Sequence, residues 1–114
     1  MSYVYRHVEV VRVIDGDTVR LDVDMGNSIF WATNFRLNGI DAADADKVKK
    51  DAATARMIEL LAGGVNRIET FKPDKFGRWL ADIYIAVDGG EMQVNQMMIN
   101  EGFAIPYFGG RKTQ

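Results

Sequence analysis

A small, mainly β domain with two helices is the fold class that this sequence predicts. Three observations support it: short runs of alternating apolar and polar residues recur at close spacing, turns rich in Gly and Asp separate them, and one long segment has a helical period. The length of 114 residues suits one domain, spanning residues 1–114, with a single core.

Composition and charge exclude several classes of protein. The formal net charge is −2, so a strongly basic, sequence-blind duplex binder is not expected. The chain has no cysteine, which excludes disulfides and thiolate metal sites. No apolar run is long enough to span a membrane, and the N-terminus lacks the apolar core of a signal peptide. We therefore expect a cytoplasmic protein, unless a leader has been removed, with a monomer as the default state.

The first three strands are predicted at residues 7–14, 18–24 and 28–38. The doublet Val10-Val11 breaks the alternation of the first strand and predicts either a bulge or a strand that is buried on both faces. "DGDT" at 15–18 is a tight turn, from which Asp17 is expected to point outward. The third strand places alternate residues on one face, and these are Ile29, Trp31, Thr33, Phe35 and Leu37. Arg36 is then on the opposite, polar face.

A helix is predicted after residue 46, and Gly63-Gly64 ends it. Its apolar face is predicted from spacings of three and four to consist of Val48, Ala52, Ala55, Ile58 and Leu61. Strands follow at 65–71, 79–87 and 91–94, with a loop at 72–78 and a hairpin turn at 88–90. A second helix is predicted with Asn95 as N-cap and Gly102 just past its end, and the tail after it is expected to be irregular.

This order of elements predicts an OB-fold. An OB-fold is a five-stranded barrel with a helix between strands 3 and 4, and here a short C-terminal helix follows. Many OB-folds bind oligonucleotides, but the fold alone does not establish a function.

Three stretches carry residues suited to chemistry on a phosphate, and these are "DGDT", "FRLNGIDAAD" and "DKFGRW". Two carboxylates, such as Asp17 and Asp41, with carbonyl oxygens and water would suit a hard cation such as Ca²⁺. Arg36 could hold a phosphate through paired N–H donors. From residue type alone other interpretations stay open: Asp17 also fits a simple turn residue, and Asp44 and Asp46 also fit helix N-terminal acids.

Four motifs together resemble the staphylococcal nuclease-like (thermonuclease) domains. "VIDGDTVRL", "FRLNGIDA", "DKFGRWLADIYI" and "VNQMMINEGFA" occur in the family's order, from about Val8 to about Tyr107. The resemblance implies Ca²⁺-dependent hydrolysis of DNA and RNA, with 3′-phosphate products. It implies single-stranded DNA or RNA and nucleotides as partners.

The resemblance also assigns roles to residues, position by position. The catalytic residues it implies are Arg36, Asp44 and Arg78. The metal ligands it implies are Asp17, Asp41, the carbonyl of Ala42, and Asp44. Lys75 matches a lysine beside the substrate's terminal phosphate, and Tyr107 could stack on a base.

Three positions depart from the family pattern, and the first is Ala43, which stands where the family usually has a proline. Asp44 stands where the family has a glutamate that serves the attacking water, and its side chain is shorter by roughly 1.5 Å. A misplacement of about 1 Å can cost about a hundredfold in rate. Phe76 stands where a tyrosine is common. The alternative hypothesis is therefore a non-catalytic OB-type module that binds nucleic acid, nucleotides or a protein.

Overall fold

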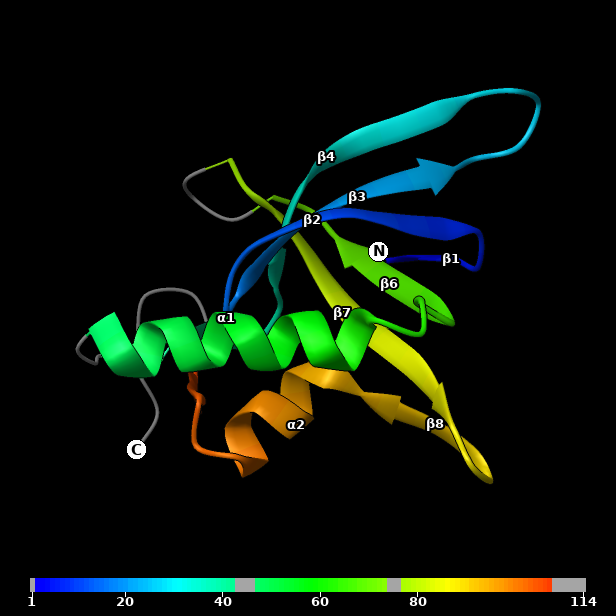
Figure 1. Cartoon of the computed structure of the whole chain (residues 1–114). Coiled ribbons are helices and arrows are strands. Elements are labelled where there is room, and N and C mark those ends of the chain that lie inside the picture. Colours follow the sequence, from blue (N-terminus) through cyan, green and yellow to red (C-terminus); the bar gives the residue numbers. More distant parts are fainter. Residues whose placement is uncertain (1, 43–46, 74–76, 108–114) are drawn as a thin grey trace.

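The computed structural model describes residues 2–42, 47–73 and 77–107. Strands dominate this part of the chain, and two helices lie away from the projecting tip of the β3–β4 hairpin (Figure 1). The strands are β1 (Tyr3–Tyr5), β2 (Val8–Asp15), β3 (Thr18–Asp24), β4 (Phe30–Leu37), β5 (Ile40–Ala42), β6 (Arg67–Phe71), β7 (Trp79–Val87), β8 (Gly90–Gln93) and β9 (Ala104–Pro106). The helices are α1 (Lys47–Leu61) and α2 (Val94–Asn100). Neither described helix is long and apolar enough to cross a membrane.

Seven strands form one sheet in the order β1-β6-β7-β4-β3-β2, with β8 beside β7. All of its pairings are antiparallel except that between β4 and β7. The five longest strands are the five of the predicted barrel, and α1 lies in the connection between the third and fourth of them. The structure is therefore mainly β with two helices, as predicted, and is consistent with an OB-like barrel. The hydrogen-bonded path of strands does not close.

The predicted irregularity in the first strand is confirmed. The register of β2 against β3 shifts between Val10 and Arg12, so Val11 is the extra residue of a bulge. Val11 is 55% exposed, whereas Val10 packs against the core. The bulge thus lets a valine doublet enter a strand without burying both side chains.

The predicted inward face of the third strand is confirmed from Trp31 to Leu37 but fails at Ile29. Phe35 and Leu37 are fully buried, but Ile29 is 57% exposed and precedes the strand. Figure 1 shows why: the hairpin of β3 and β4 projects beyond the rest of the sheet, where no other element covers it. Alternation gives the direction of a side chain, but not whether a neighbour lies there.

The predicted apolar face of the first helix was wrong except at Leu61, which is buried. The buried residues of α1 are Ala53, Met57, Leu60 and Leu61. Val48 is 78% exposed and Ile58 is 53% exposed. The sequence carries two stripes with helical spacing, and periodicity cannot tell which of them meets the sheet. The stripe that is buried contains the bulkier set of Met and Leu side chains.

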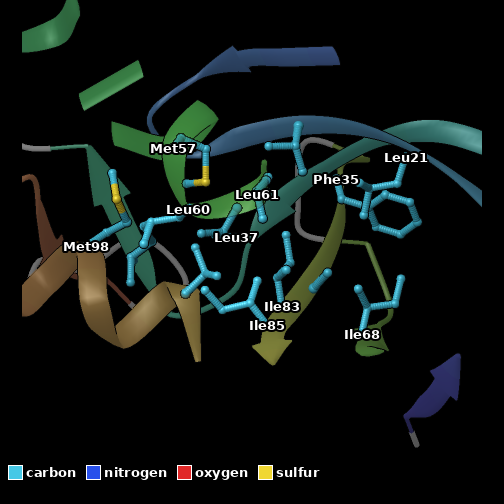
Figure 2. Close-up of a cluster of buried hydrophobic side chains, with 14 of the residues drawn as sticks. Leu21, Phe35, Leu37, Met57, Leu60, Leu61, Ile68, Ile83, Ile85 and Met98 are labelled. Carbon is cyan, nitrogen blue, oxygen red and sulfur yellow. The ribbon is translucent and has the colours of Figure 1, made fainter. Parts of the chain in front are cut away.

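The core lies between the sheet and the two helices (Figure 2). Its largest fully buried side chains are Phe35, Leu21, Leu37, Ile40, Met57, Ile68, Ile83 and Met98. Trp31 extends the core along β4 through edge-to-face contacts with Phe35 and Trp79, at ring-centroid distances of 5.1 and 5.0 Å. Burial of one such side chain stabilises the fold by about 1.5–3 kcal/mol.

Two predictions near the C-terminus were wrong. The N-cap of α2 is Gln93, because the helix begins at Val94, one residue before the predicted cap. Gly102 lies just past its end with φ 82°, as predicted. The segment after it is not irregular throughout, since β9 pairs antiparallel with β5. A three-residue strand gives no alternation long enough to recognise in a sequence.

Candidate active site

The "DGDT" turn and Arg36 are brought together by the pairing of β3 with β4. Thr18 pairs with Arg36 at the end of this ladder. One step further, the Leu37 N–H donates to the Asp17 carbonyl oxygen at 2.8 Å. This hydrogen bond holds Asp17 beside β4, although Asp17 is 19 positions before Arg36 in the sequence.

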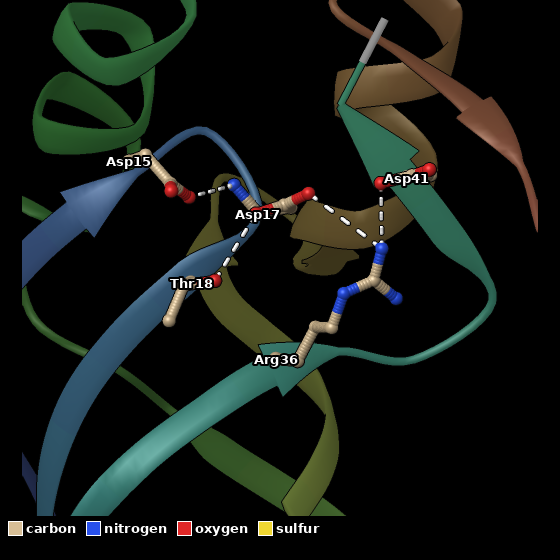
Figure 3. A network of polar contacts seen from close by, with 5 residues as sticks. All are labelled: Asp15, Asp17, Thr18, Arg36 and Asp41. Atoms are coloured by element: carbon tan, nitrogen blue, oxygen red, sulfur yellow. Dashed lines mark hydrogen bonds and ion pairs between the residues drawn. The ribbon is translucent and has the colours of Figure 1, made fainter. Parts of the chain in front are cut away.

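The side chain of Asp17 is oriented by its neighbours in the turn. The Asp17 N–H donates to Asp15 Oδ1 at 3.0 Å, and the Thr18 hydroxyl donates to Asp17 Oδ1 at 3.1 Å. Asp17 is only 8% exposed, so the expectation that it points outward from the hairpin was wrong. Its second oxygen, Oδ2, faces Arg36 (Figure 3).

Gly16 lets this turn lie against helix α1. A Cβ atom at Gly16 would lie 2.8 Å from the Cβ of Ala53, which is closer than two such atoms approach in proteins. The glycine is thus required for close packing rather than for a positive φ. This contact links the position of α1 to that of the turn that carries Asp17.

Arg36 joins the two aspartates. Its Nη2 lies 2.6 Å from Asp41 Oδ1 and 3.7 Å from Asp17 Oδ2 (Figure 3). The arginine is 6% exposed, so it is a buried ion-pair residue and not the solvated strand residue that its type alone would suggest. Both aspartates engage the same nitrogen. Nη1 and Nε form no hydrogen bond with other described residues, so these donors can serve a ligand.

Asp41 is placed by the small sheet that the sequence did not predict. It lies in β5, where its Cα partner is Ile105 of β9. The Tyr107 N–H donates to the Gly39 carbonyl oxygen at 2.9 Å, which extends this pairing. The Tyr107 ring then lies near the guanidinium of Arg36, with its centroid 5.4 Å from Cζ, within the range of a cation–π contact. Tyr107 therefore lies beside Arg36.

Asn95 is a residue of this region whose role the sequence did not reveal. Strand β7 pairs with β4 up to Ala81 and with β8 from Tyr84, which leaves a gap in the ladder between them. The Asn95 amide fills that gap: Oδ1 accepts the Ile83 N–H at 3.0 Å, and Nδ2 donates to the Ala81 carbonyl at 3.0 Å. Nδ2 also donates to the Asn38 carbonyl at 2.9 Å. Because Asn38 lies in the turn from β4 to β5, Asn95 anchors the turn between Arg36 and Asp41.

Asp82 completes this buried polar cluster. Its Oδ1 accepts from Asn95 Nδ2 at 3.2 Å and from Asn38 Nδ2 at 3.5 Å. Burial raises the pKa of Asp82 above its usual value, and nearby Glu69 adds to this rise. The hydrogen bond from Asn38 opposes the rise. Ionisation of Asp82 therefore costs the folded state some stability.

The charge of the site suits a cation. Asp17 and Asp41 carry two negative charges against one guanidinium, and carboxylate oxygens are the ligands that Ca²⁺ prefers. Ala42, the proposed carbonyl ligand, follows Asp41 in β5. Within the described residues no group of three or more His, Cys, Asp or Glu side chains comes together as a metal site. The chain thus offers two convergent carboxylates, and Asp44 lies outside the described residues, as does Asp46.

The second predicted phosphate arginine approaches the site from β7. Arg78 is exposed and directly precedes Trp79, whose partner in β4 is Phe35. This register puts the backbone of Arg78 beside Asn34, two residues from Arg36 on β4. Lys75 and Phe76 lie outside the described residues.

Comparison with known proteins agrees with this arrangement. The family model for the staphylococcal nuclease homologue matches residues 34–114, which include Arg36, Asp41 and Arg78. The chain is 37% identical over 101 residues to an uncharacterized endonuclease of Escherichia coli O157:H7, covering 89% of the chain and 61% of that protein. It is 30% identical over 104 residues to a micrococcal nuclease of Shigella flexneri, covering 87% and 57%.

A third relative is a protein ParB of Escherichia coli, 33% identical over 113 residues, covering 90% of the chain and 59% of that protein. The chain therefore spans about three fifths of the length of each of these relatives. The family match extends over most of the chain and begins within β4, two residues before the buried arginine. The chain belongs to the staphylococcal nuclease homologue family.

Proposed function

We propose that this protein is a Ca²⁺-dependent nuclease that hydrolyses phosphodiester bonds of single-stranded DNA and RNA and leaves 3′-phosphate ends. The observation that carries the proposal is the buried guanidinium of Arg36 between Asp17 and Asp41, which come from different elements. A structural ion pair needs one carboxylate, whereas this arginine has two. Two carboxylates face one guanidinium, which favours a cation, and the N–H donors of Arg36 that bond to no other described residue suit a phosphate oxygen.

Each residue then has a defined task. Asp17 and Asp41, with the carbonyl of Ala42, would hold Ca²⁺. The bound Ca²⁺ would supply positive charge to a phosphate oxygen and to an attacking water. Arg36 and Arg78 hold the phosphate and stabilise the charge that develops on it. Asp44 is the proposed general base for the water, and Lys75 is the proposed partner of a terminal phosphate.

Tyr107 has two tasks in this proposal. Its ring, 5.4 Å from the Arg36 guanidinium, limits the directions in which that side chain can turn. The partly exposed ring also offers a surface on which a base can stack. Stacking does not depend on base identity, so we propose little sequence preference.

Cleavage of labelled single-stranded DNA and RNA, with Ca²⁺ or with a chelator, tests the proposal. We expect cleavage only with Ca²⁺, and a loss of at least about a hundredfold in Arg36→Lys, which keeps the charge but lacks the planar fork. Arg6→Lys is the matched control, because Arg6 is exposed outside the sheet. Equal cleavage with chelator would refute metal dependence. Nucleotide binding without any turnover would instead support the non-catalytic module.

A further inference from the structure

A row of arginines crosses the polar face of the sheet beside the candidate active site. In the strand registers, Arg12 of β2 pairs with Arg20 of β3, and Arg20 pairs with Asn34 of β4. Arg78 lies next to Asn34, because the following Trp79 pairs with Phe35. We call Arg12, Arg20, Asn34 and Arg78 the arginine row. It spans roughly 14 Å, three spacings between neighbouring strands.

The arginine row lies beside the pair formed by Thr18 and Arg36. On β3, Arg20 is two residues from Thr18, and on β4, Asn34 is two residues from Arg36. Residues two apart on a strand point to the same face and are about 6.8 Å apart. Arg12 belongs to this same outer face, since it is exposed while Val13 packs against the core. A chain of phosphates that passes Arg36 therefore meets this row next.

The electrostatics of the row favour an anionic ligand. Arg12 and Arg20 are directly opposite each other, an arrangement that destabilises a sheet. Arg20 Nη1 donates to Asn34 Oδ1 at 3.2 Å, which orients its guanidinium. The Arg12 side chain forms no hydrogen bond or ion pair with any other residue that the structure describes. Glu9 and Asp22 form the pair beyond that of Val10 and Leu21, but within the described chain neither is in an ion pair with these arginines.

We infer that the arginine row binds the backbone phosphates of a single-stranded polynucleotide next to the phosphate held at Arg36. The inference rests on the proposed function and adds to it the path of the substrate strand across β4, β3 and β2. Phosphates placed between Arg12 and Arg20 offset the repulsion of the two guanidinium groups. The contacts are to phosphate and not to base edges, so binding here is independent of sequence.

The test is the salt dependence of binding to a labelled single-stranded DNA of about 16 nucleotides, the upper site size of an OB-fold. A chelator prevents hydrolysis, and the dissociation constant is measured between about 50 and 200 mM salt. In the double variant Arg12→Gln/Arg20→Gln the slope of log affinity against log salt should fall by about 1.4, or 0.7 for each lost phosphate contact. Binding of a dinucleotide, which is too short to reach the row, should not change.

The control variant Arg6→Gln/Lys50→Gln removes the same charge away from the arginine row, since both side chains are exposed outside the sheet. It should keep the wild-type slope within about 0.3. The thermal midpoint of Arg12→Gln/Arg20→Gln should not fall, because a repulsive pair is removed. An unchanged slope in this variant, or a wild-type protein that cleaves DNA without binding the oligonucleotide, would overturn the inference alone. A wild-type protein that neither binds nor cleaves would overturn the proposed function as well.

Discussion

Replacement of Asn95 by Ala should destabilise the fold far more than a surface amide does. Asn95 is 2% exposed, and its loss leaves two buried backbone groups without their partner: the Ile83 N–H and the Asn38 carbonyl. The Ala81 carbonyl still accepts the Asn38 N–H at 2.8 Å. An unsatisfied buried group costs about 1–3 kcal/mol, so we expect the free energy of unfolding to fall by about 2–6 kcal/mol. A domain of this size has about 5–15 kcal/mol in total.

Urea denaturation followed by circular dichroism measures this loss. Asn100→Ala is the matched control, because Asn100 is an exposed residue of the same helix whose amide accepts from Gln96 and from no other side chain in the described ranges. It should change the free energy of unfolding by less than about 0.5 kcal/mol. The slope against urea should not change in either variant. A loss in Asn95→Ala no larger than that in Asn100→Ala would refute the role of the buried amide.

Three further predictions test the packing and charge of the fold. Gly16→Ala should destabilise by about 1–3 kcal/mol in urea denaturation, because its Cβ would overlap helix α1, whereas Gly63→Ala, with open space around it, should be neutral. Met57→Ala should cost about 2–5 kcal/mol and Ile58→Ala much less, since only Met57 is buried; equal losses would contradict the observed helix face. Asp82→Asn should stabilise the protein at neutral pH. The pKa of Asp82 is raised in the folded wild type, so the wild type loses stability as pH rises from the unfolded-state pKa through the folded-state pKa. The difference in thermal midpoint between Asp82→Asn and the wild type should therefore be small near pH 4 and grow toward pH 7. A difference that does not depend on pH would refute this.

The long strands and the site residues in local motifs could be predicted from the sequence. Asp17 and Arg36 are each fixed by a turn or strand that carries its own signal, and the pairing of β3 with β4 follows from the hairpin between them. That pairing places the two side chains within 3.7 Å of each other, so their convergence is a consequence of local structure.

The position of Asp41 and the role of Asn95 depend on contacts between distant segments. Asp41 is paired with Ile105 of β9, and the Asn95 amide replaces ladder bonds missing from β7. Neither has a periodic signal, because a three-residue strand and a single amide are too short to form one. An asparagine at the start of a predicted helix is typical of an N-cap. Its other role becomes visible only when the unpaired positions of β7 are known.

The face of α1 could not be predicted for a different reason. Periodicity identified the helix correctly, but it offered two apolar stripes, and the choice depends on the sheet against which the helix packs. Gly16 belongs to the predicted tight turn at 15–18. In the structure it also packs closely against Ala53, a residue of the buried stripe.

The most direct test of the central claim is the end chemistry of the products. Mass spectrometry of fragments from a defined single-stranded DNA should detect 3′-phosphate ends in the presence of Ca²⁺. These fragments should be absent with chelator and absent from Arg36→Ala prepared in the same way, which also controls for contaminating nucleases. Fragments with 5′-phosphate ends, or equal amounts of fragments from Arg36→Ala, would contradict the assignment of Asp17, Arg36 and Asp41 as the active site.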